Sequence, residues 1–234
     1  RVVMGVLYNS RIVTDGLVFC LDAGDKMSYP GAGTTWTDLS KQGNNGTLTN
    51  GPTFDSANGG SIVFDGTNDY VSITRNSSIT PNYISVCGWI KINSKSSNQF
   101  LLALPRSVNG GASYMMYYSL SLDGFVAYAR TNSTGTIQTT STFSPDTGRW
   151  YFLSMTSNGS NLILFIDGEF EASLSFSSVL EYSGSTVLRI GSYDNQGTPT
   201  YTNGNIPLTQ IYNRALTPDE IRQNYNATKG RFGL

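Results

Sequence analysis

The stretch that decides the fold is LTQIYNRALTPDEIRQNY, residues 208–225. It holds a complete helix start in a chain that otherwise reads as short strands and Gly/Asn turns. Thr217 can cap a helix and Pro218 suits the first helical position. Glu220 lies three residues after the cap and completes a capping box. We therefore predict that a helix begins here.

This helix should be short and apolar on one side. Ile221 and Tyr225 are four residues apart and so share a helix face, and Asn226 is predicted to end the run. A single short amphipathic helix near the C-terminus is an unusual feature in a β-rich chain, so it helps to identify the fold.

The rest of the chain predicts strands joined by tight turns. Residues 83–92 (YISVCGWIKI) are apolar on both faces, which is typical of a central sandwich strand. Asp123-Gly124 and Asp167-Gly168 are strong hairpin signals. About a dozen strands at spacings of 8–12 residues predict one two-sheet antiparallel sandwich over residues 16–234. We expect residues 24–54 to form a long structured loop and residues 194–204 a polar loop.

Composition excludes several classes of function. The 234 residues are 38% hydrophobic and 13% charged, with a formal charge of −1, so there is no basic footprint for nucleic acid. No apolar run approaches the ~20 residues that span a bilayer. The chain has no histidine, which removes the usual general base of Ser and Cys hydrolases.

Two cysteines, Cys20 and Cys87, lie in apolar strand-like runs. Buried thiols that behave as small hydrophobic side chains are the favoured interpretation. A single disulfide between them is the alternative, because the sequence does not place the two sulfur atoms.

Six segments together resemble the concanavalin A-like jelly roll, in its laminin G-like branch. In chain order they are WTDLSKQGNNGTLTNGPTF, SIVFDGTNDYVSI, ISVCGWIKI, RWYFLSMTSNGSNLILFIDGE, LRIGSYD and NGNIPLTQIYNRALTPDEI. The resemblance implies an all-β, two-sheet antiparallel jelly-roll sandwich with one short C-terminal helix. It also implies that the helix packs over the sandwich edge and is structural.

Residues 28–54, from SYPG to GPTF, and the C-terminal residues 221–234, IRQNYNATKGRFGL, are similar to stand-alone laminin G-like structural proteins of tailed bacteriophages. This resemblance implies a non-enzymatic virion protein at the virion surface, in contact with other virion proteins and present as a homo-oligomer or in many copies on a lattice. Decoration of the capsid is the function it favours. The alternative is a glycan-binding receptor lectin on a tail or head fibre, with cell-surface glycans as partners.

A cluster of carboxylates could instead indicate a glycosidase. Asp167, Glu169 and Glu171 are spaced like the acidic triplet of glucanases with this fold, and two carboxylates about 5–5.5 Å apart suit retaining hydrolysis. However, Asp167-Gly168 is a turn signal, so we expect the triplet to straddle a hairpin. Solvated turn acids are the favoured interpretation.

The resemblance also raises a calcium site, because laminin G-like domains often hold calcium through oxygen ligands. Five residues could supply such ligands: Asp38, Asn44, Asn45, Asp65 and Asp69. Pro207 stands near a position that is frequently acidic in the family. Because proline has no carboxylate, this departure counts against a calcium site. The alternative is that these side chains bind their own turns.

Aromatic side chains suggest a glycan surface, since the chain has 14 Tyr and 3 Trp. The residues considered are Tyr114, Tyr117, Tyr118, Tyr128, Tyr193 and Tyr201. Strand alternation puts Tyr114, Met116 and Tyr118 on one face and Met115 and Tyr117 on the other, and one face should point outward. Sandwich core or a subunit interface is the alternative for each tyrosine.

The N-terminal segment, residues 1–15, is apolar and precedes the first sure strand. Val2, Val3, Val6 and Leu7 could anchor the protein by strand pairing with a neighbour. Packing along the sandwich edge is equally compatible with the sequence.

Overall fold

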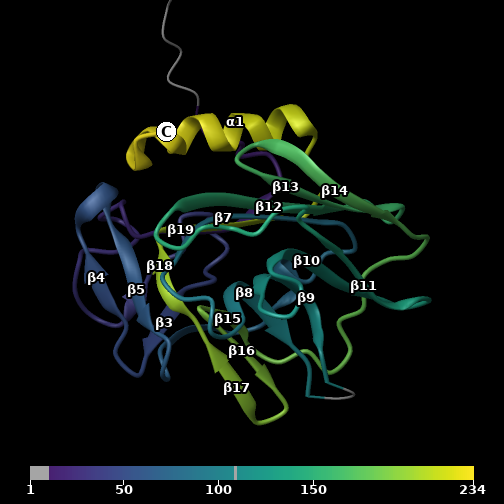
Figure 1. Ribbon diagram of the computed structural model, residues 1–234, viewed down its shortest axis with the longest axis horizontal. Coiled ribbons are helices and arrows are strands. Elements are labelled where there is room, and N and C mark those ends of the chain that lie inside the picture. Colours follow the sequence, from purple (N-terminus) through teal and green to yellow (C-terminus); the bar gives the residue numbers. More distant parts are fainter. Residues whose placement is uncertain (1–10, 108–109) are drawn as a thin grey trace, which may run out of the picture.

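The computed structural model describes residues 11–107 and 110–234. Two large antiparallel sheets face each other, a helix lies outside one of them, and a two-stranded ribbon extends from the other (Figure 1). The family fold expected from the sequence, an all-β sandwich with one short C-terminal helix, is confirmed.

The first sheet has nine strands, and β7 lies at its centre. β12 pairs with one edge of β7, and β18 and β19 follow each other along the opposite edge, on either side of Pro207. The strands are β1 (Leu17–Asp22), β4 (Thr53–Asp55), β5 (Ser61–Asp65), β7 (Ile84–Ile92), β12 (Trp150–Ser157), β13 (Asn161–Ile166), β14 (Glu169–Ser175), β18 (Asn203–Ile206) and β19 (Leu208–Tyr212).

The second sheet has eight strands in the order β11-β10-β9-β8-β15-β6-β3-β2. Its strands are β2 (Thr35–Trp36), β3 (Gly46–Thr49), β6 (Tyr70–Ile73), β8 (Gln99–Pro105), β9 (Ala112–Ser119), β10 (Gly124–Thr131), β11 (Gly135–Thr140) and β15 (Leu188–Ile190). The segment predicted as a long loop therefore contains β2, β3 and the start of β4, and Trp36 is fully buried in it.

The ribbon consists of β16 (Ser192–Asn195) and β17 (Thr198–Tyr201), joined at Gln196-Gly197. Both turn residues have positive φ, 55° and 88°, as a two-residue hairpin turn requires. The prediction of a polar loop over 194–204 was wrong, because these residues form most of this hairpin and the start of β18.

The main core lies between the two sheets. Its largest fully buried side chains include Trp36, Phe64, Tyr114, Tyr118, Phe125 and Tyr151. Tyr114 donates its hydroxyl hydrogen to the Ile79 carbonyl at 3.0 Å, and Tyr118 donates to Asp123 at 2.8 Å. These two tyrosines belong to the core, so their assignment to a glycan surface was wrong.

A second core lies between the nine-stranded sheet and helix α1 (Pro218–Thr228). Trp89 lies at its centre, with ring centroids 5.7 Å from Tyr225 and 4.2 Å from Phe232. The capping box at Thr217 and Glu220 is present as predicted. The helix covers the outer face of the sheet, not its edge (Figure 1), and it ends two residues later than predicted, before the 3-10 turn η3 (Lys229–Phe232).

The chain preceding β1 is tied to this helix. The Val13 amide donates to Asn224 Oδ1 at 2.8 Å, and the Val13 carbonyl accepts from the Tyr212 hydroxyl at 3.0 Å. Residues 11–15 therefore pack on the domain, beyond the boundary predicted at residue 16. The proposed anchor residues Val2, Val3, Val6 and Leu7 lie outside the described residues.

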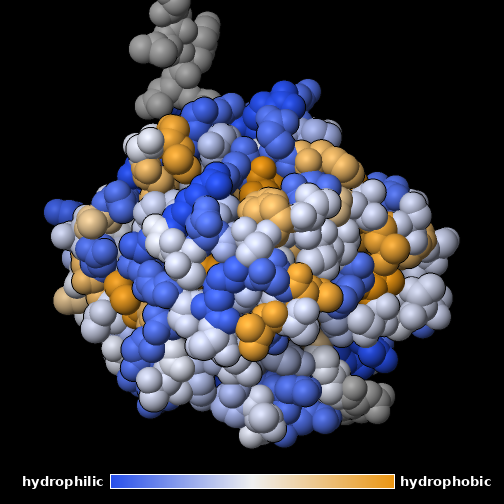
Figure 2. All heavy atoms as spheres, viewed as in Figure 1, coloured by the Kyte–Doolittle hydropathy of each residue, from blue (hydrophilic) through white to orange (hydrophobic). Residues whose placement is uncertain are grey.

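Two short 3-10 turns, η1 (Ala57–Gly59) and η2 (Ser77–Ile79), complete the elements. In the part of the chain that the structure describes, no helix has the length and apolar character that crossing a bilayer requires. On the face shown in Figure 2, hydrophobic residues form small patches separated by polar ones.

Candidate glycan site on the eight-stranded sheet

An aromatic cluster covers part of the outer face of the eight-stranded sheet. β9 turns Tyr114, Met116 and Tyr118 inward, so Met115 and Tyr117 point outward. Ala112 of β9 belongs to the same cluster, and the neighbouring strands add Phe100, Ala103, Val126 and Tyr128, with Tyr193 packed against them. The alternation predicted for 114–118 is therefore confirmed, with Met115 and Tyr117 on the outer face.

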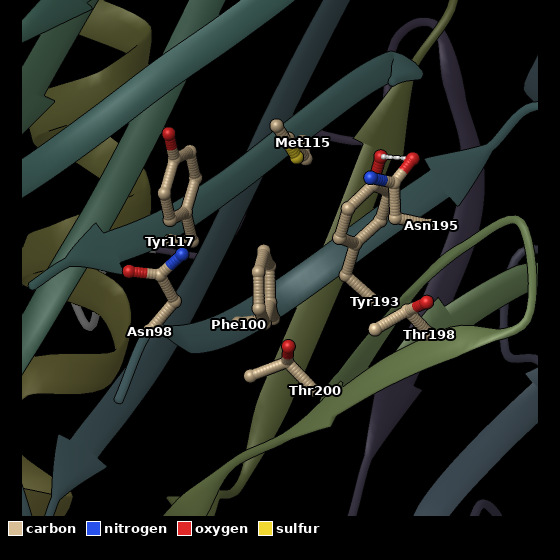
Figure 3. Close-up of a pocket in the computed structure, with 8 residues that line it drawn as sticks. All are labelled: Asn98, Phe100, Met115, Tyr117, Tyr193, Asn195, Thr198 and Thr200. Carbon is tan, nitrogen blue, oxygen red and sulfur yellow. Dashed lines mark hydrogen bonds between the residues drawn. The ribbon is translucent and has the colours of Figure 1, made fainter. Parts of the chain in front are cut away.

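Three rings in this cluster lie side by side. The Phe100 ring is in the middle, with its centroid 5.1 Å from that of Tyr117 at an interplanar angle of 17°, and 5.3 Å from that of Tyr193. The three rings line one hollow (Figure 3). The volume of this hollow is about 230 Å³. Offset rings at these separations are favourable and rigid.

Polar side chains surround the rings. Asn98 lies beside Tyr117, while Asn195, Thr198 and Thr200 come from the ribbon, on the side of Tyr193 (Figure 3). The pairing of Tyr193 with Thr200 and of Asn195 with Thr198 places these four on one face of the ribbon. Met115 completes the lining.

The ribbon is held in place beside β8 by hydrogen bonds at its base. The Phe100 amide donates to Thr202 Oγ1 at 2.7 Å, and the same hydroxyl donates to the Phe100 carbonyl at 3.0 Å. The Asn203 amide also donates to Gln99 Oε1, at 2.6 Å. Because Phe100 and the ribbon share these bonds, the position of Tyr193 over Phe100 is built into the fold.

Burial changes the acidity of the phenols. Burial, with a smaller contribution from Tyr128, raises the pKa of Tyr193 to about 12. Burial likewise raises the pKa of Tyr117. Both hydroxyls are therefore protonated in neutral solution and can act as hydrogen-bond donors.

The six predicted tyrosines therefore separate into three groups. Tyr117 and Tyr193 line the hollow, and Tyr128 belongs to the same cluster, with its hydroxyl 3.0 Å from Thr136 Oγ1. Tyr114 and Tyr118 are in the core. Tyr201 has its ring 6.5 Å from that of Tyr70 and is paired with Ser192, so it does not line the hollow.

Five lining residues were not predicted from the sequence: Asn98, Phe100, Asn195, Thr198 and Thr200. A usable signal was present for the ribbon, since alternating polar residues flank the Gln196-Gly197 turn on both sides. No comparable signal marked Phe100, whose outward direction follows from a bulge in β8 where the pairing with β9 shifts.

The residues predicted for calcium do not fit one site. Asp38 accepts four hydrogen bonds, two on each carboxylate oxygen, from the Cys20 and Ser40 amides, the Ser40 hydroxyl and the Asn44 amide. Asn45 Oδ1 accepts from the Asp38 amide at 2.9 Å. These oxygens hold the loop on β1, which is the alternative that the sequence left open.

Asp65 and Asp69 lie at a different turn, between β5 and β6. Asp65 Oδ1 accepts from the Thr67 amide at 2.7 Å, and Asp69 Oδ2 accepts from the Asp65 amide at 3.3 Å. Burial, and then the Asp65 charge, raises the pKa of Asp69. Within residues 11–107 and 110–234, no three His, Cys, Asp or Glu side chains gather as metal ligands, so Asp38 does not join this pair.

The predicted hairpin separates the acidic triplet. Asp167 and Gly168 form the turn, with φ of 53° and 84°. Asp167 forms an ion pair with Arg149 at 2.8 Å, and Glu169 forms one with Arg222 of the helix at 3.3 Å. Glu171 lies at the irregularity in the pairing of β14 with β13, and its carboxylate accepts a hydrogen bond from the Thr142 hydroxyl at 2.7 Å. The three carboxylates therefore face different partners.

The sequence of residues 65–222 matches the family model of the concanavalin A-like lectin/glucanases superfamily. The match spans most of the chain, and the chain belongs to this superfamily. No curated protein sequence matches the chain.

Solved structures share the fold at low sequence identity. The binding domain of Paraclostridial mosquitocidal protein 1 is similar with a TM-score of 0.68 and 18% identity, over 92% of this chain and 52% of that one. The binding domain of botulinum neurotoxin DC, in complex with rat synaptotagmin II, has a TM-score of 0.70 and 15% identity, over 92% and 52%. Trypanosoma rangeli sialidase in complex with sialic acid has a TM-score of 0.67 and 16% identity, over 92% and 33%. The chain thus spans about half of each toxin domain and a third of the sialidase chain.

Proposed function

We propose that this protein is a non-enzymatic glycan-binding module and that its binding site is the aromatic hollow on the eight-stranded sheet. The observation that carries the proposal is the row of Tyr117, Phe100 and Tyr193 with a polar rim. A pyranose ring has an apolar face that packs on aromatic rings and hydroxyls that need hydrogen-bond partners. The hollow offers both, as small-ligand sites generally do.

The position of the site on the molecule supports the proposal. Helix α1 covers the outer face of the nine-stranded sheet, so the aromatic side chains there are packed against protein. The aromatic row on the eight-stranded sheet is also largely buried, with Phe100 2% and Tyr117 9% exposed, but it lines a hollow whose rim residues Asn195 and Thr198 are exposed.

The relatives give partial support. The superfamily name includes lectins, and the similar structures include the binding domain of the mosquitocidal protein and a sialidase that holds sialic acid. At these identities the likeness carries the fold alone. The ligand of this chain depends on its own side chains.

The test is a glycan array probed with the full chain, followed by titration of the strongest glycan against two variants. Tyr193→Ala removes one of the three rings, and we expect it to weaken binding by about tenfold or more, which is ~1.4 kcal/mol. Tyr201→Ala is the matched control, because Tyr201 is on the same ribbon but does not line the hollow. Equal affinity of the two variants would place the binding site elsewhere.

A second candidate function is decoration of a phage capsid at the virion surface. Its support is the resemblance of the loop at residues 28–54 and of the C-terminus to phage structural proteins, and a decoration protein could also bind glycans. An electron-microscopy reconstruction of the native particle tests it. The expected result is density for this sandwich at regular lattice positions of the capsid. Density at fibre tips would favour the receptor lectin. Particles without density for the sandwich would refute both the capsid and the fibre location.

A further inference from the structure

Among the described residues, those that line the hollow carry no charge. They are Asn98, Phe100, Met115, Tyr117, Tyr193, Asn195, Thr198 and Thr200. Charged residues close to them in the chain are engaged elsewhere: Arg189 binds Asp194 at 3.0 Å, and Lys95 binds Asp123 at 2.5 Å. Asp194 also accepts a hydrogen bond from the Gly197 amide at 2.7 Å, so its carboxylate is used to close the ribbon turn.

The rim offers hydrogen-bond donors that the fold does not use. Asn98 Oδ1 accepts from the Leu120 amide at 2.9 Å, and Asn195 Oδ1 accepts from the Tyr193 hydroxyl at 3.3 Å. Both amide oxygens are thus occupied and both NH₂ groups remain. Across the described residues, no hydrogen bond of the fold engages these NH₂ groups or the hydroxyls of Thr198 and Thr200.

These donors stand on opposite sides of the aromatic row. Asn98 is at the Tyr117 end, and Asn195 is at the Tyr193 end, with the Phe100 ring between them (Figure 3). A sugar ring seated in the hollow, between Asn98 and Asn195, could therefore accept hydrogen bonds at both of its ends. Sugar hydroxyl oxygens and ring oxygens are neutral acceptors of this kind.

An acidic sugar would be poorly served by this lining. A carboxylate or sulfate that leaves water needs a charged partner or several strong donors, and Arg provides the usual bidentate bond. Burial of an unpaired anion beside Phe100 and Met115 would lose hydration without replacement. Two amide groups are weak compensation for that loss.

We infer that the hollow binds an uncharged pyranose and discriminates against sialylated and sulfated glycans. This inference rests on the proposed function and assigns the ligand class of the same site. The physical reason is that the described lining residues include no cationic side chain.

The experiment compares matched glycans with the full chain. A neutral oligosaccharide taken from the array is titrated beside the same oligosaccharide carrying one sialic acid or one sulfate. We expect the acidic forms to bind about tenfold more weakly or worse, and the affinity for the neutral form to change little between low and high salt. Acidic forms that bind as well as the neutral form would overturn the inference.

A charge-introducing variant gives an independent readout. Thr200→Arg places a guanidinium beside Phe100, and we expect it to narrow or reverse the preference by improving binding of the acidic glycan about tenfold in low salt. Thr67→Arg, at an exposed turn outside the hollow, is the control and should leave the preference unchanged. An equal gain in affinity for the acidic glycan in both variants would overturn the inference. It would show that the net charge of the protein, and not the lining of the hollow, sets the preference for neutral glycans.

The two proposals fail in different ways. Binding of acidic glycans that is lost in Tyr193→Ala would refute the neutral ligand class and keep the glycan site. Binding that survives Tyr193→Ala, or no binding to any glycan, would refute the site itself and the ligand class with it.

Discussion

Gln210 lies between the two cysteines of the chain, on the face of the nine-stranded sheet that helix α1 covers. It is the pairing partner of Cys20 on β1 and of Cys87 on β7, so the cysteines are two strand positions apart. Two interstrand spacings amount to about 9.6 Å, whereas disulfide-bonded Cα atoms are at most about 7 Å apart. Both cysteines are free and buried, and the disulfide that the sequence left open is excluded.

These thiols should be unreactive in the native protein. Burial raises the pKa of Cys20 and of Cys87 to about 12 in each case, and the thiolate is the reactive form. We expect iodoacetamide to modify neither residue in the folded chain and both after unfolding in urea. Mass spectrometry of the two samples measures this, and rapid labelling of the native chain would contradict the burial of both thiols.

At the scale of elements, the ribbon β16–β17 depends on the glycine that precedes it. Gly191 has a φ of 75°, and a Cβ there would lie 2.5 Å from the Phe64 ring. Gly197 in the ribbon turn has a φ of 88° but no atom within 4 Å of a Cβ. The two glycines thus share a backbone requirement and differ in their surroundings.

Replacing each of these two glycines by alanine separates the effect of backbone strain from that of side-chain overpacking. We expect Gly197→Ala to lower the free energy of unfolding by about 1 kcal/mol, because alanine is strained at a positive φ. Gly191→Ala should lower the free energy of unfolding by more, about 2–4 kcal/mol, because the added Cβ also overpacks against the Phe64 ring. Urea unfolding of both variants measures the difference, and equal losses would show that the Phe64 contact relaxes freely.

The capping box at the start of helix α1 makes a smaller, local contribution to the free energy of unfolding. Thr217 Oγ1 accepts from the Glu220 amide at 3.3 Å and Glu220 binds Arg214 at 2.6 Å. We expect Thr217→Ala to lower the free energy of unfolding by about 1 kcal/mol. Thr67→Ala, at an exposed turn, is the control and should change it by less than about 0.5 kcal/mol. A loss in the control as large as in Thr217→Ala would rule out a specific capping effect.

At the scale of the whole molecule, buried phenols hold the layers together. Tyr114 lies between the two sheets and Tyr212 lies between the nine-stranded sheet and the helix. Burial raises the pKa of Tyr114, Tyr182 and Tyr212, and raises that of Tyr118 to about 12. All four groups must keep their protons for the native packing to persist.

Stability should therefore fall in alkaline solution. An unfolded tyrosine loses its proton near pH ~10, whereas these buried ones lose it at higher pH. The unfolded state then binds fewer protons than the native state, so the phenols lower the free energy of unfolding as pH rises above about 10, in addition to the loss that the two buried thiols begin above about pH 8.5. Urea unfolding over this range measures the slope, which Tyr114→Phe should reduce. A flat profile would contradict the burial of these phenols.

Interactions between residues close in the chain were predictable from the sequence. The capping box at Thr217, the Asp167-Gly168 turn and the alternation of residues 114–118 each depend on neighbours a few positions away. They established the helix, the hairpins and, with the family resemblance, the sandwich. Of the site, Tyr117, Tyr128 and Tyr193 were among the residues considered.

Only the tertiary structure decided which of those tyrosines are available to a ligand. Alternation states that Tyr114 and Tyr117 point to opposite faces, but both faces of β9 are apolar, so the pattern does not say which one meets the other sheet. Phe100 and Tyr193 are distant in the chain and meet because the ribbon is bound to β8 through Thr202. The sequence by itself therefore determined the family, the capped helix and most of the strands. The short strands β2 and β3, the ribbon β16–β17 and the site depend on long-range packing, which no local pattern encodes.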